Sequence, residues 1–407
     1  MKPPLDGISV LDLSRVLAGP WATQLLADMG ADVIKVERPG SGDDTRAWGP
    51  PWHERGDNRV AAYFLAANRG KRSIAVDIGH PDGAALVRRA ALASDVVVEN
   101  FKVGGLKRYG LDAASLREDN PRLIVASITG FGQDGPSSHE AGYDFAIQAR
   151  GGLMSVTGEA DGGPLRAGVA VADLFTGLYT ANAITAALLR REQTGAGAHV
   201  DVALLDVQTA MLANQALNYF VGGSSPPRQG NTHPNIVPYQ SFAVANGEVV
   251  VAVGNDAQFR RLAALAGANW AEDPRFATNA ARVSHRAELV PLIAARMLQR
   301  SAKDWLQVLA AAGIPCAPVN DIAAVFDDPQ VRHRGMRIDR DSPAYGSIPG
   351  LAAPIRFDRE APLSPRAQPG LGEHGREVLR EWGCGEDEIN ALAASGAVQL
   401  AGSSGSL

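Results

Sequence analysis

Three observations predict an α/β protein that has a mainly parallel sheet and a smaller second domain in the middle of the chain. Strand-like apolar runs alternate with helical patterns over the first half, and strands separated by helices favour a parallel sheet covered on both faces. The 407 residues exceed what one core usually organises, so two domains are expected. The run GGSSPP at 222–227 marks a change of composition and predicts a linker.

The strands and helices of the first half follow from their hydrophobic patterns. Residues 8–13 form a continuous apolar run and predict a buried strand. A helix is predicted over 20–29, with Pro20 near its start and Gly30 at its end. The alternation continues with strands at 33–37, 95–99 and 123–128 and a helix at 81–93.

A long helix and a hairpin are the clearest signals in the second half. An apolar helical pattern runs from Asp173 to about Arg191 and is broken by TGAG at 194–197. Asn246-Gly247 lies between two strand-like runs and is the strongest short hairpin signal in the chain. The other predicted elements are a strand at 200–205, a helix ending at Phe220, hairpin strands at 239–244 and 248–253, and helices over 258–312.

These patterns divide the chain into a large domain, a small domain and their connections. We expect residues 1–200 to form the first part of the large domain and 201–225 a linker helix region. Residues 226–325 are expected to form the small domain, and 326–407 a linker that returns to the large one. The closing GSSGS at 402–406 predicts a disordered tail.

Composition narrows the class of protein. A net charge of −5 gives no support for nucleic-acid binding. The two cysteines have no metal-ligand spacing and fit a reducing compartment. The start of the chain does not resemble a signal peptide, and no apolar run is long enough to span a membrane. We therefore expect a cytoplasmic protein without a membrane or nucleic-acid partner and without a metal.

Asp173 lies at the start of the predicted long helix, within GPLRAGVAVADLFTG at 163–177. One interpretation is an N-cap, since an Asp oxygen readily accepts the N–H groups of a first turn. The other is chemical. The same donors and the positive helix end lower the pKa of a carboxyl and keep it ionised. An ionised carboxylate among small residues is what a covalent acyl acceptor requires.

Basic residues recur near the ends of predicted strands. Arg38 follows the second strand, NRGKR at 68–72 precedes another apolar stretch, and Lys107-Arg108 follows Asn100-Phe101. Ligands of parallel sheets bind beyond the carboxyl ends of the strands, so cations converging there would hold a phosphorylated ligand. The alternative is a solvated basic surface. The usual phosphate loops, GxGxxG after the first strand and Walker A, are absent from the sequence.

Several of these segments together resemble the class III (CaiB/BaiF) CoA-transferases, over nearly the whole chain. Each motif alone is weak, but the set is specific. The segments are VLDLSRVLAGP at 10–20, GADVIKVE at 30–37, NRGKRS at 68–73, VENF at 98–101, TGFG at 129–132 and LGEH at 371–374.

The resemblance implies a fold, a reaction and a set of site residues. The fold is an interlocked homodimer, in which each chain has a Rossmann-like large domain built from both chain ends and a small domain from the middle. The reaction moves CoA between carboxylic acids through covalent intermediates on Asp173, with coenzyme A or acyl-CoA as substrate and no permanently bound cofactor. The positions that match CoA-binding ones are Val16, Ala18, Arg38, Asn68, Lys71, Arg72, Asn100, Phe101 and Arg108.

Differences from related families indicate the acceptor. The related α-methylacyl-CoA racemases have a His-Asp pair where this chain has Tyr143-Asp144, which disfavours racemisation. The glycine flap of formyl-CoA transferases is absent from the sequence. GNTHPNIVPYQ at 230–240 and GNDAQF at 254–259 are instead similar to succinyl-CoA:glutarate CoA-transferases.

A dicarboxylate acceptor has a second charge that must be neutralised if it is buried. We expect Arg46, within DDTRAW at 43–48, or Arg166 to pair with it, near Trp48, Tyr143 and Asp144. The alternative is that each arginine makes only a structural ion pair, Arg46 with Asp43 or Asp44. Three other functions stay open: a different acyl pair, a racemase-like isomerase, and a CoA-binding protein in which Asp173 only caps its helix.

Overall fold

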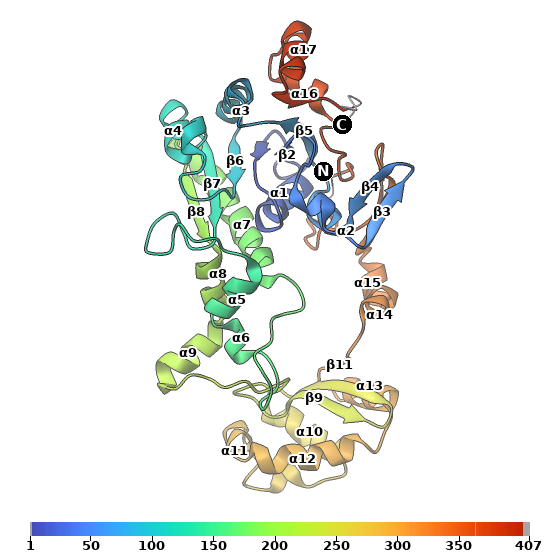
Figure 1. Cartoon of the computed structure of the whole chain (residues 1–407). Helices are drawn as coiled ribbons and strands as arrows, with labels where there is room; N and C mark the ends of the chain where they lie inside the picture. Colours follow the sequence, from blue (N-terminus) through green and yellow to red (C-terminus); the bar gives the residue numbers. More distant parts are fainter. Residues whose placement is uncertain (1, 363, 402–407) are drawn as a thin grey trace. The chain divides into compact units, whose positions relative to one another are not determined.

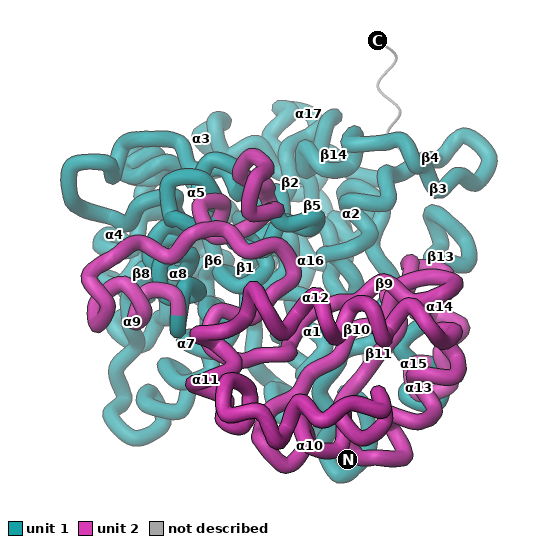
Figure 2. The backbone as a smooth tube through the Cα atoms, turned by 90° about the horizontal axis from the view of Figure 1, so that it is seen from below, with its two compact units in different colours: residues 1–153, 167–214, 332–407 teal, residues 154–166, 215–331 magenta. Residues whose placement is uncertain are grey.

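The computed structural model describes residues 2–362 and 364–401, which form two compact units (Figure 2). The larger unit takes residues up to 153, 167–214 and from 332 onward. The smaller unit takes 154–166 and 215–331. The predicted tail at 402–406 lies outside the described residues.

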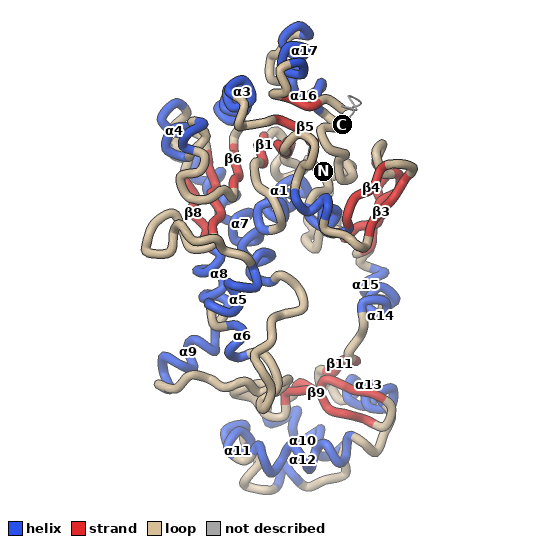
Figure 3. The backbone as a smooth tube through the Cα atoms, viewed as in Figure 1, coloured by secondary structure: helices blue, strands red, loops and turns tan. Residues whose placement is uncertain are grey.

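A seven-stranded sheet organises the larger unit, in the order β14-β5-β2-β1-β6-β7-β8 (Figures 1 and 3). Neighbouring strands are parallel except for β14, which pairs antiparallel with β5 at one edge. The mainly parallel α/β sheet is therefore confirmed. The strands are β1 Ser9–Asp12, β2 Asp32–Glu37, β5 Arg72–Val76, β6 Val96–Glu99, β7 Ile124–Thr129, β8 His199–Ala203 and β14 Val398–Gln399.

Helices cover both faces of this sheet because its central strands are apolar on both sides. One face packs against helices α1 Ala18–Asp28, α5 Asp144–Arg150, α7 Val171–Thr194 and α8 Leu204–Met211. The other face packs against α3 Pro81–Ala93, α4 Ala113–Asp119, α16 Gly375–Glu381 and α17 Glu386–Ala394. The predicted helix at 81–93 has these bounds, and the others differ by a few residues.

The strand order reverses beside β1. From β1 the chain builds outward through β2 and β5, and it then returns to add β6, β7 and β8 on the other side. The connections that follow the neighbouring strands β1 and β6 run to opposite sides of the sheet. They therefore leave a crevice between them at the carboxyl edge. This is the position where open α/β sheets bind ligands.

The smaller unit contains a three-stranded antiparallel sheet, and four of its α-helices lie between the second and third of these strands along the chain. Its strands are β9 Tyr239–Val244, β10 Gly247–Ala252 and β11 Cys316–Pro318, and its core holds Phe259, Phe276 and Trp305. The predicted hairpin is present, but its two-residue turn is Ala245-Asn246, because Gly247 already pairs with Val244. The helices are α10 Asp256–Leu265, α11 Asn279–Ser284, α12 Arg286–Met297 and α13 Ala302–Ala311.

The segment expected to be a linker after residue 326 contains regular structure. Strands β12 Arg337–Ser342 and β13 Gly346–Leu351 form a hairpin. Tyr345 and Ile348 from this hairpin pack with Phe64 of α2 Ala62–Ala67 in a small core of their own. The abundance of charge, Pro and Gly therefore concealed a folded element. Short helices α14 Ile322–Asp327 and α15 Pro329–His333 precede it.

No helix in the part of the chain that the structure describes is both long and apolar enough to cross a membrane.

Candidate active site

Asp173 is the third residue of α7 and does not cap it. Helix α7 begins at Val171, and its N-cap residue, Ala170, has no side-chain acceptor. The first-turn N–H groups of Ala172 and Asp173 instead donate to Asp144 Oδ1, at 2.8 and 3.3 Å. The capping interpretation of Asp173 is therefore wrong, because a carboxylate from the start of α5 already takes that role. Asp144 lies in the first turn of its own helix, α5, but accepts from the first turn of α7.

The Asp173 carboxylate is left without a partner. Among the described residues, no group donates a hydrogen bond to it and no cation pairs with it. Burial and the neighbouring negative charge of Asp144 raise the pKa of Asp173 from 3.8 to about 7. The sequence predicted a lowered pKa from the helix end, and that prediction is wrong in direction. Desolvation and a second carboxylate outweigh the helix dipole here.

Two aromatic side chains, Trp48 and Tyr63, form a pair, and Tyr63 lies near Asp173 and Asp144. Trp48 follows the 3₁₀ turn η1 Asp44–Ala47, and its ring meets that of Tyr63 edge to face at 5.1 Å. Burial and the charges of Asp173 and Asp144 raise the pKa of the Tyr63 phenol, which places all three groups in one electrostatic environment. Sequence reasoning missed Tyr63, since a tyrosine in the apolar segment AYFLAA reads as a core residue. Tyr143 precedes α5 and is exposed.

A close crossing of α1 and α7 determines where Asp173 lies. A Cβ on Gly177 would be 2.6 Å from the Ala18 carbonyl oxygen and 3.0 Å from the Trp21 ring. Only glycine therefore permits this approach, one turn after Asp173. The crossing brings the start of α1, with Ala18, beside the first turns of α7. Gly177, the glycine at the end of the segment 163–177, serves this packing.

The loop between β1 and α1 is strained and held from two sides. Val16 has φ of +72°, a left-handed conformation that is unusual for a β-branched residue. Its N–H donates to Asp43 Oδ1 at 3.3 Å. Asn100 holds the adjacent Arg15 backbone, accepting from its N–H at 2.9 Å and donating to its carbonyl at 2.7 Å. The Arg15 guanidinium lies over the Phe101 ring. A strained backbone conformation persists only where the surrounding contacts hold it, and such positions cluster at functional sites.

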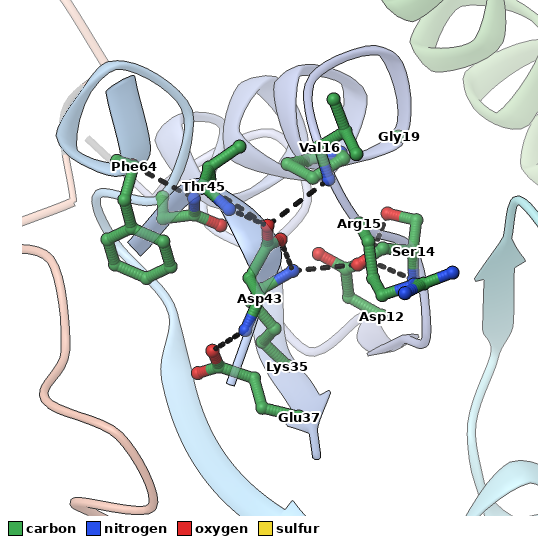
Figure 4. A network of polar contacts seen from close by, with 12 residues as sticks. Asp12, Ser14, Arg15, Val16, Gly19, Lys35, Glu37, Asp43, Thr45 and Phe64 are labelled. Atoms are coloured by element: carbon green, nitrogen blue, oxygen red, sulfur yellow. Dashed lines mark hydrogen bonds and ion pairs between the residues drawn. The ribbon is translucent and has the colours of Figure 1, made fainter. Parts of the chain in front are cut away.

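A buried ionic network supports this loop (Figure 4). Lys35 Nζ pairs with Asp43 at 2.9 Å and donates to the Ser14 carbonyl at 2.7 Å. Lys71 Nζ pairs with Asp12 at 3.0 Å and donates to Asn68 Oδ1 at 2.8 Å. Burial opposes ionisation of Asp12, but Lys71, Lys35 and two hydroxyls lower its pKa to about 2. Burial lowers the pKa of Lys71 to about 8.

The predicted CoA-binding residues do not all converge at one sheet edge. Val16, Ala18, Asn100 and Phe101 gather around the loops at the carboxyl edge. Arg72 begins β5 and therefore lies at the amino edge, where it pairs with Asp32, Glu377 and Glu381. The expectation of shared placement is wrong for Arg72, because β5 runs parallel to β2 and its first residue lies opposite the carboxyl edge. Asn68 and Lys71 are fully buried, whereas Arg38 and Arg108 are exposed.

Arg46 makes a structural ion pair, but with a different partner from those expected. Its Nε and Nη2 donate to the two Glu37 oxygens, each at 2.7 Å. Its Nη1 donates to the Tyr345 hydroxyl at 3.2 Å, and its guanidinium lies over Phe64. The prediction that Arg46 pairs with Asp43 or Asp44 is therefore wrong. Arg166 belongs to the smaller unit.

Within residues 2–362 and 364–401, no three His, Cys, Asp or Glu side chains lie close enough together to hold a metal ion.

Comparisons with known proteins identify the family. A family model described as CoA-transferase family III matches residues 5–375. A succinate–glutarate CoA-transferase of Agrobacterium fabrum is 53% identical, covering 93% of this chain and 96% of the relative. A succinyl-CoA:glutarate CoA-transferase of Mus musculus is 43% identical, covering 97% and 90%. The crystal structure of a CaiB/BaiF family protein from Brucella suis is 51% identical, with a TM-score of 0.83 over 94% of this chain and 100% of that one.

Proposed function

The chain belongs to CoA-transferase family III, and from that premise we propose that it moves CoA from succinyl-CoA to a small dicarboxylate such as glutarate through Asp173. One observation carries the assignment of Asp173: its carboxylate is half-buried at the start of α7 and has no partner among the described residues. A carboxylate that is desolvated and not engaged in an ion pair is a stronger nucleophile than a solvated one. The choice of acids rests on the names of the relatives.

The proposed reaction uses two mixed anhydrides and one thioester. An Asp173 oxygen attacks the thioester carbonyl of succinyl-CoA, the C–S bond breaks, and CoA leaves as its thiolate. The thiolate attacks the aspartyl carbonyl and releases succinate, which leaves an aspartyl-CoA thioester. A glutarate carboxylate then attacks that thioester and expels the thiolate again. Attack of the thiolate on the glutaryl carbonyl forms glutaryl-CoA and restores the Asp173 carboxylate.

The CoA moiety is proposed to lie along the carboxyl edge of the sheet. We propose that Val16, Ala18, Asn100 and Phe101 contact it there and that the exposed cations Arg38 and Arg108 bind its phosphates. Asn68 and Lys71 are proposed to act from beneath, through the Asp12 network, and Arg72 by holding β5 to α16.

The acceptor is proposed to lie near Trp48, Tyr143, Asp144 and the newly identified Tyr63. Arg46 uses its donors on Glu37, Tyr345 and Pro369, so of the two arginines predicted to pair with the acceptor's second carboxylate, Arg166 is the one tested first. Arg166→Ala should raise KM for glutarate about tenfold or more and leave KM for succinyl-CoA nearly unchanged. An unchanged KM for glutarate would remove Arg166 from the site.

Intact mass after mixing with succinyl-CoA tests the covalent route. Wild-type protein should gain the mass of CoA, and hydroxylamine should remove it. Asp173→Asn should show no adduct and lose at least about a thousandfold in transfer, while it folds normally because Asp173 does not cap α7. If a panel of acyl-CoAs including succinyl-, glutaryl- and acetyl-CoA leaves no adduct, the route through Asp173 is wrong.

An interlocked homodimer is proposed as the working form. Helix α7 exposes Phe175, Leu178, Tyr179 and Leu189, which is more apolar surface than a free helix face usually carries. Sedimentation should give twice the chain mass, and the dimer should dissociate only when the chains unfold, because interlocked chains cannot separate while folded. A monomer at micromolar concentration would contradict this proposal.

A further inference from the structure

Gln148 is a fully buried amide in α5, and its two ends have different partners. Its Nε2 donates to Asp144 Oδ2 at 2.6 Å, and its Oε1 accepts from the Ala167 N–H at 2.9 Å. Ala167 belongs to the segment that leads into α7. One side chain thus ties α5, the Asp144 carboxylate and the approach to α7 together.

Only an amide satisfies both partners. An ionised carboxylate can only accept a hydrogen bond, and a backbone N–H can only donate one. The residue between them must therefore donate at one end and accept at the other, over a span that fits glutamine. A carboxylate at this position would face Asp144 as a second acceptor, and an aliphatic side chain would leave both groups unsatisfied in a buried place.

The contacts continue from Asp144 to Asp173. Asp144 Oδ1 accepts the N–H groups of Ala172 and Asp173, while Oδ2 is held by Gln148. Both carboxylate oxygens are therefore engaged, and the plane of the group is determined. The Asp173 backbone takes its position from a carboxylate that Gln148 orients. A misplacement of about 1 Å is enough to reduce a rate strongly when reacting groups must be aligned.

We propose that Gln148 is a positioning residue for acyl transfer, which acts through Asp144 to hold Asp173 at the start of α7. Because Gln148 is fully buried and its amide is taken up by Asp144 and Ala167, its role is assigned through Asp144 and not through direct contact with substrate. This inference rests on the proposed function, since it assigns a role within that reaction. It predicts a loss in kcat with little change in KM for succinyl-CoA, because the residues proposed to hold CoA do not contact Gln148.

Single substitutions give the first test. Gln148→Leu and Gln148→Glu should each lower kcat of succinyl-CoA:glutarate transfer about tenfold to a hundredfold and change KM for succinyl-CoA less than about threefold. Gln208→Leu is the matched control. Gln208 is equally buried, in the neighbouring helix α8, but its amide atoms have no hydrogen-bond partner among the described residues. This control should keep its kcat. Equal kcat in wild type and Gln148→Leu would overturn the proposal.

A swap of polarity gives the sharper test and does not depend on how stable each single variant is. Asp144→Asn still accepts the α7 N–H groups but presents an amide donor to the Gln148 donor. Combined with Gln148→Glu, the new amide donates to the new carboxylate, whose other oxygen accepts the Ala167 N–H. All hydrogen bonds and the net charge are restored. The double variant should exceed the product of the two single effects by about tenfold or more. Purely multiplicative effects would overturn the proposal.

The pH profile supplies a readout that a purely structural role would not move. The described groups that face Asp173 are Asp144 from α5 and Tyr63 from α2. The double variant moves the negative charge one side chain away from Asp173, so the ascending limb of its profile should shift to lower pH while kcat recovers. An unmoved limb would count against the role of Asp144. If the wild-type protein transfers no CoA, the proposed function is wrong. If the wild type transfers CoA and Gln148→Leu has the same kcat, only the role of Gln148 is wrong.

Discussion

Asp173 has a raised pKa, and its activity and its effect on stability depend on pH in opposite directions. The nucleophile must be ionised, and its pKa is about 7, because of burial and the charge of Asp144. Formation of the CoA adduct should therefore rise with pH, with a midpoint near that value, and fall about tenfold per unit well below it. Rapid-quench rates of adduct formation across this range test the prediction. A flat profile would contradict it.

The same ionisation destabilises the fold. A carboxyl whose pKa is higher in the folded state than in the unfolded one favours folding while protonated, below 3.8, and this contribution is lost as pH rises through about 7. Asp173→Asn should remove this part of the pH dependence of the unfolding free energy, as measured by urea denaturation. A wild-type dependence that persists in the variant would argue against the raised pKa.

Val16 offers a test of backbone strain. Its φ of +72° is one that glycine adopts without penalty and other residues do not. Val16→Gly should therefore be more stable than Val16→Ala by about 1 kcal/mol, the reverse of the usual order. Val200 in β8 is the control, since it is not among the residues of positive φ, and alanine should be the more stable substitution there. Urea denaturation gives the free energy of unfolding of each variant. If Val16→Ala were more stable than Val16→Gly, the loop would be unstrained.

The α1–α7 crossing depends on one missing methyl group. Gly177→Ala would place a Cβ 2.6 Å from the Ala18 carbonyl oxygen, so the two helices must move apart. We expect a loss of about 1–3 kcal/mol in unfolding free energy and a slower adduct formation, because Asp173 lies one turn away. The control is Gly222→Ala, in α9 Ala213–Gly222, where a Cβ would meet nothing within 4 Å. Tolerance of Gly177→Ala with full activity would disprove the close packing.

At the scale of the whole molecule, the ionic network beneath the β1 loop governs acid stability. Lys71 and Lys35 lower the pKa of Asp12 to about 2, against the opposing effect of burial, and the pKa values of Glu37 and Asp43 are lowered as well. A carboxyl group whose pKa is lower in the folded state stabilises the fold at pH values above its pKa in the unfolded state. This stabilisation is lost as the pH falls through its pKa in the folded state. For Asp12 the contribution is roughly 2 kcal/mol.

Urea denaturation at pH values from about 5 down to about 2 measures this loss. The unfolding free energy should fall steeply over that interval in the wild type and less steeply in Asp12→Asn. Asp6→Asn, at an exposed carboxylate paired with Lys2, should keep the wild-type slope. Identical slopes in all three proteins would show that the buried pairs are not the source.

Sequence alone determined the α/β class, the positions of five strands of the large sheet and of the long helix, the family and the candidate nucleophile. Hydrophobic periodicity is local, so it identified β1, β2, β6, β7 and β8 of the large sheet and the helix that carries Asp173. Spaced motifs such as VLDLSRVLAGP and VENF identified the family, because together they are specific where each alone is weak.

Tertiary structure decided the partners, and with them the roles. The way in which strands and helices pair decides three things: the carboxylate that caps α7, the ion partner of Arg46 and the sheet edge at which Arg72 lies. No local sequence pattern records this pairing. The pKa of Asp173 was predicted with the wrong sign, because its own helix is visible in the sequence while burial and Asp144 are not. Gln148 and Tyr63 were missed for the same reason. Their importance comes from the groups that they face, and those groups meet only when the chain folds.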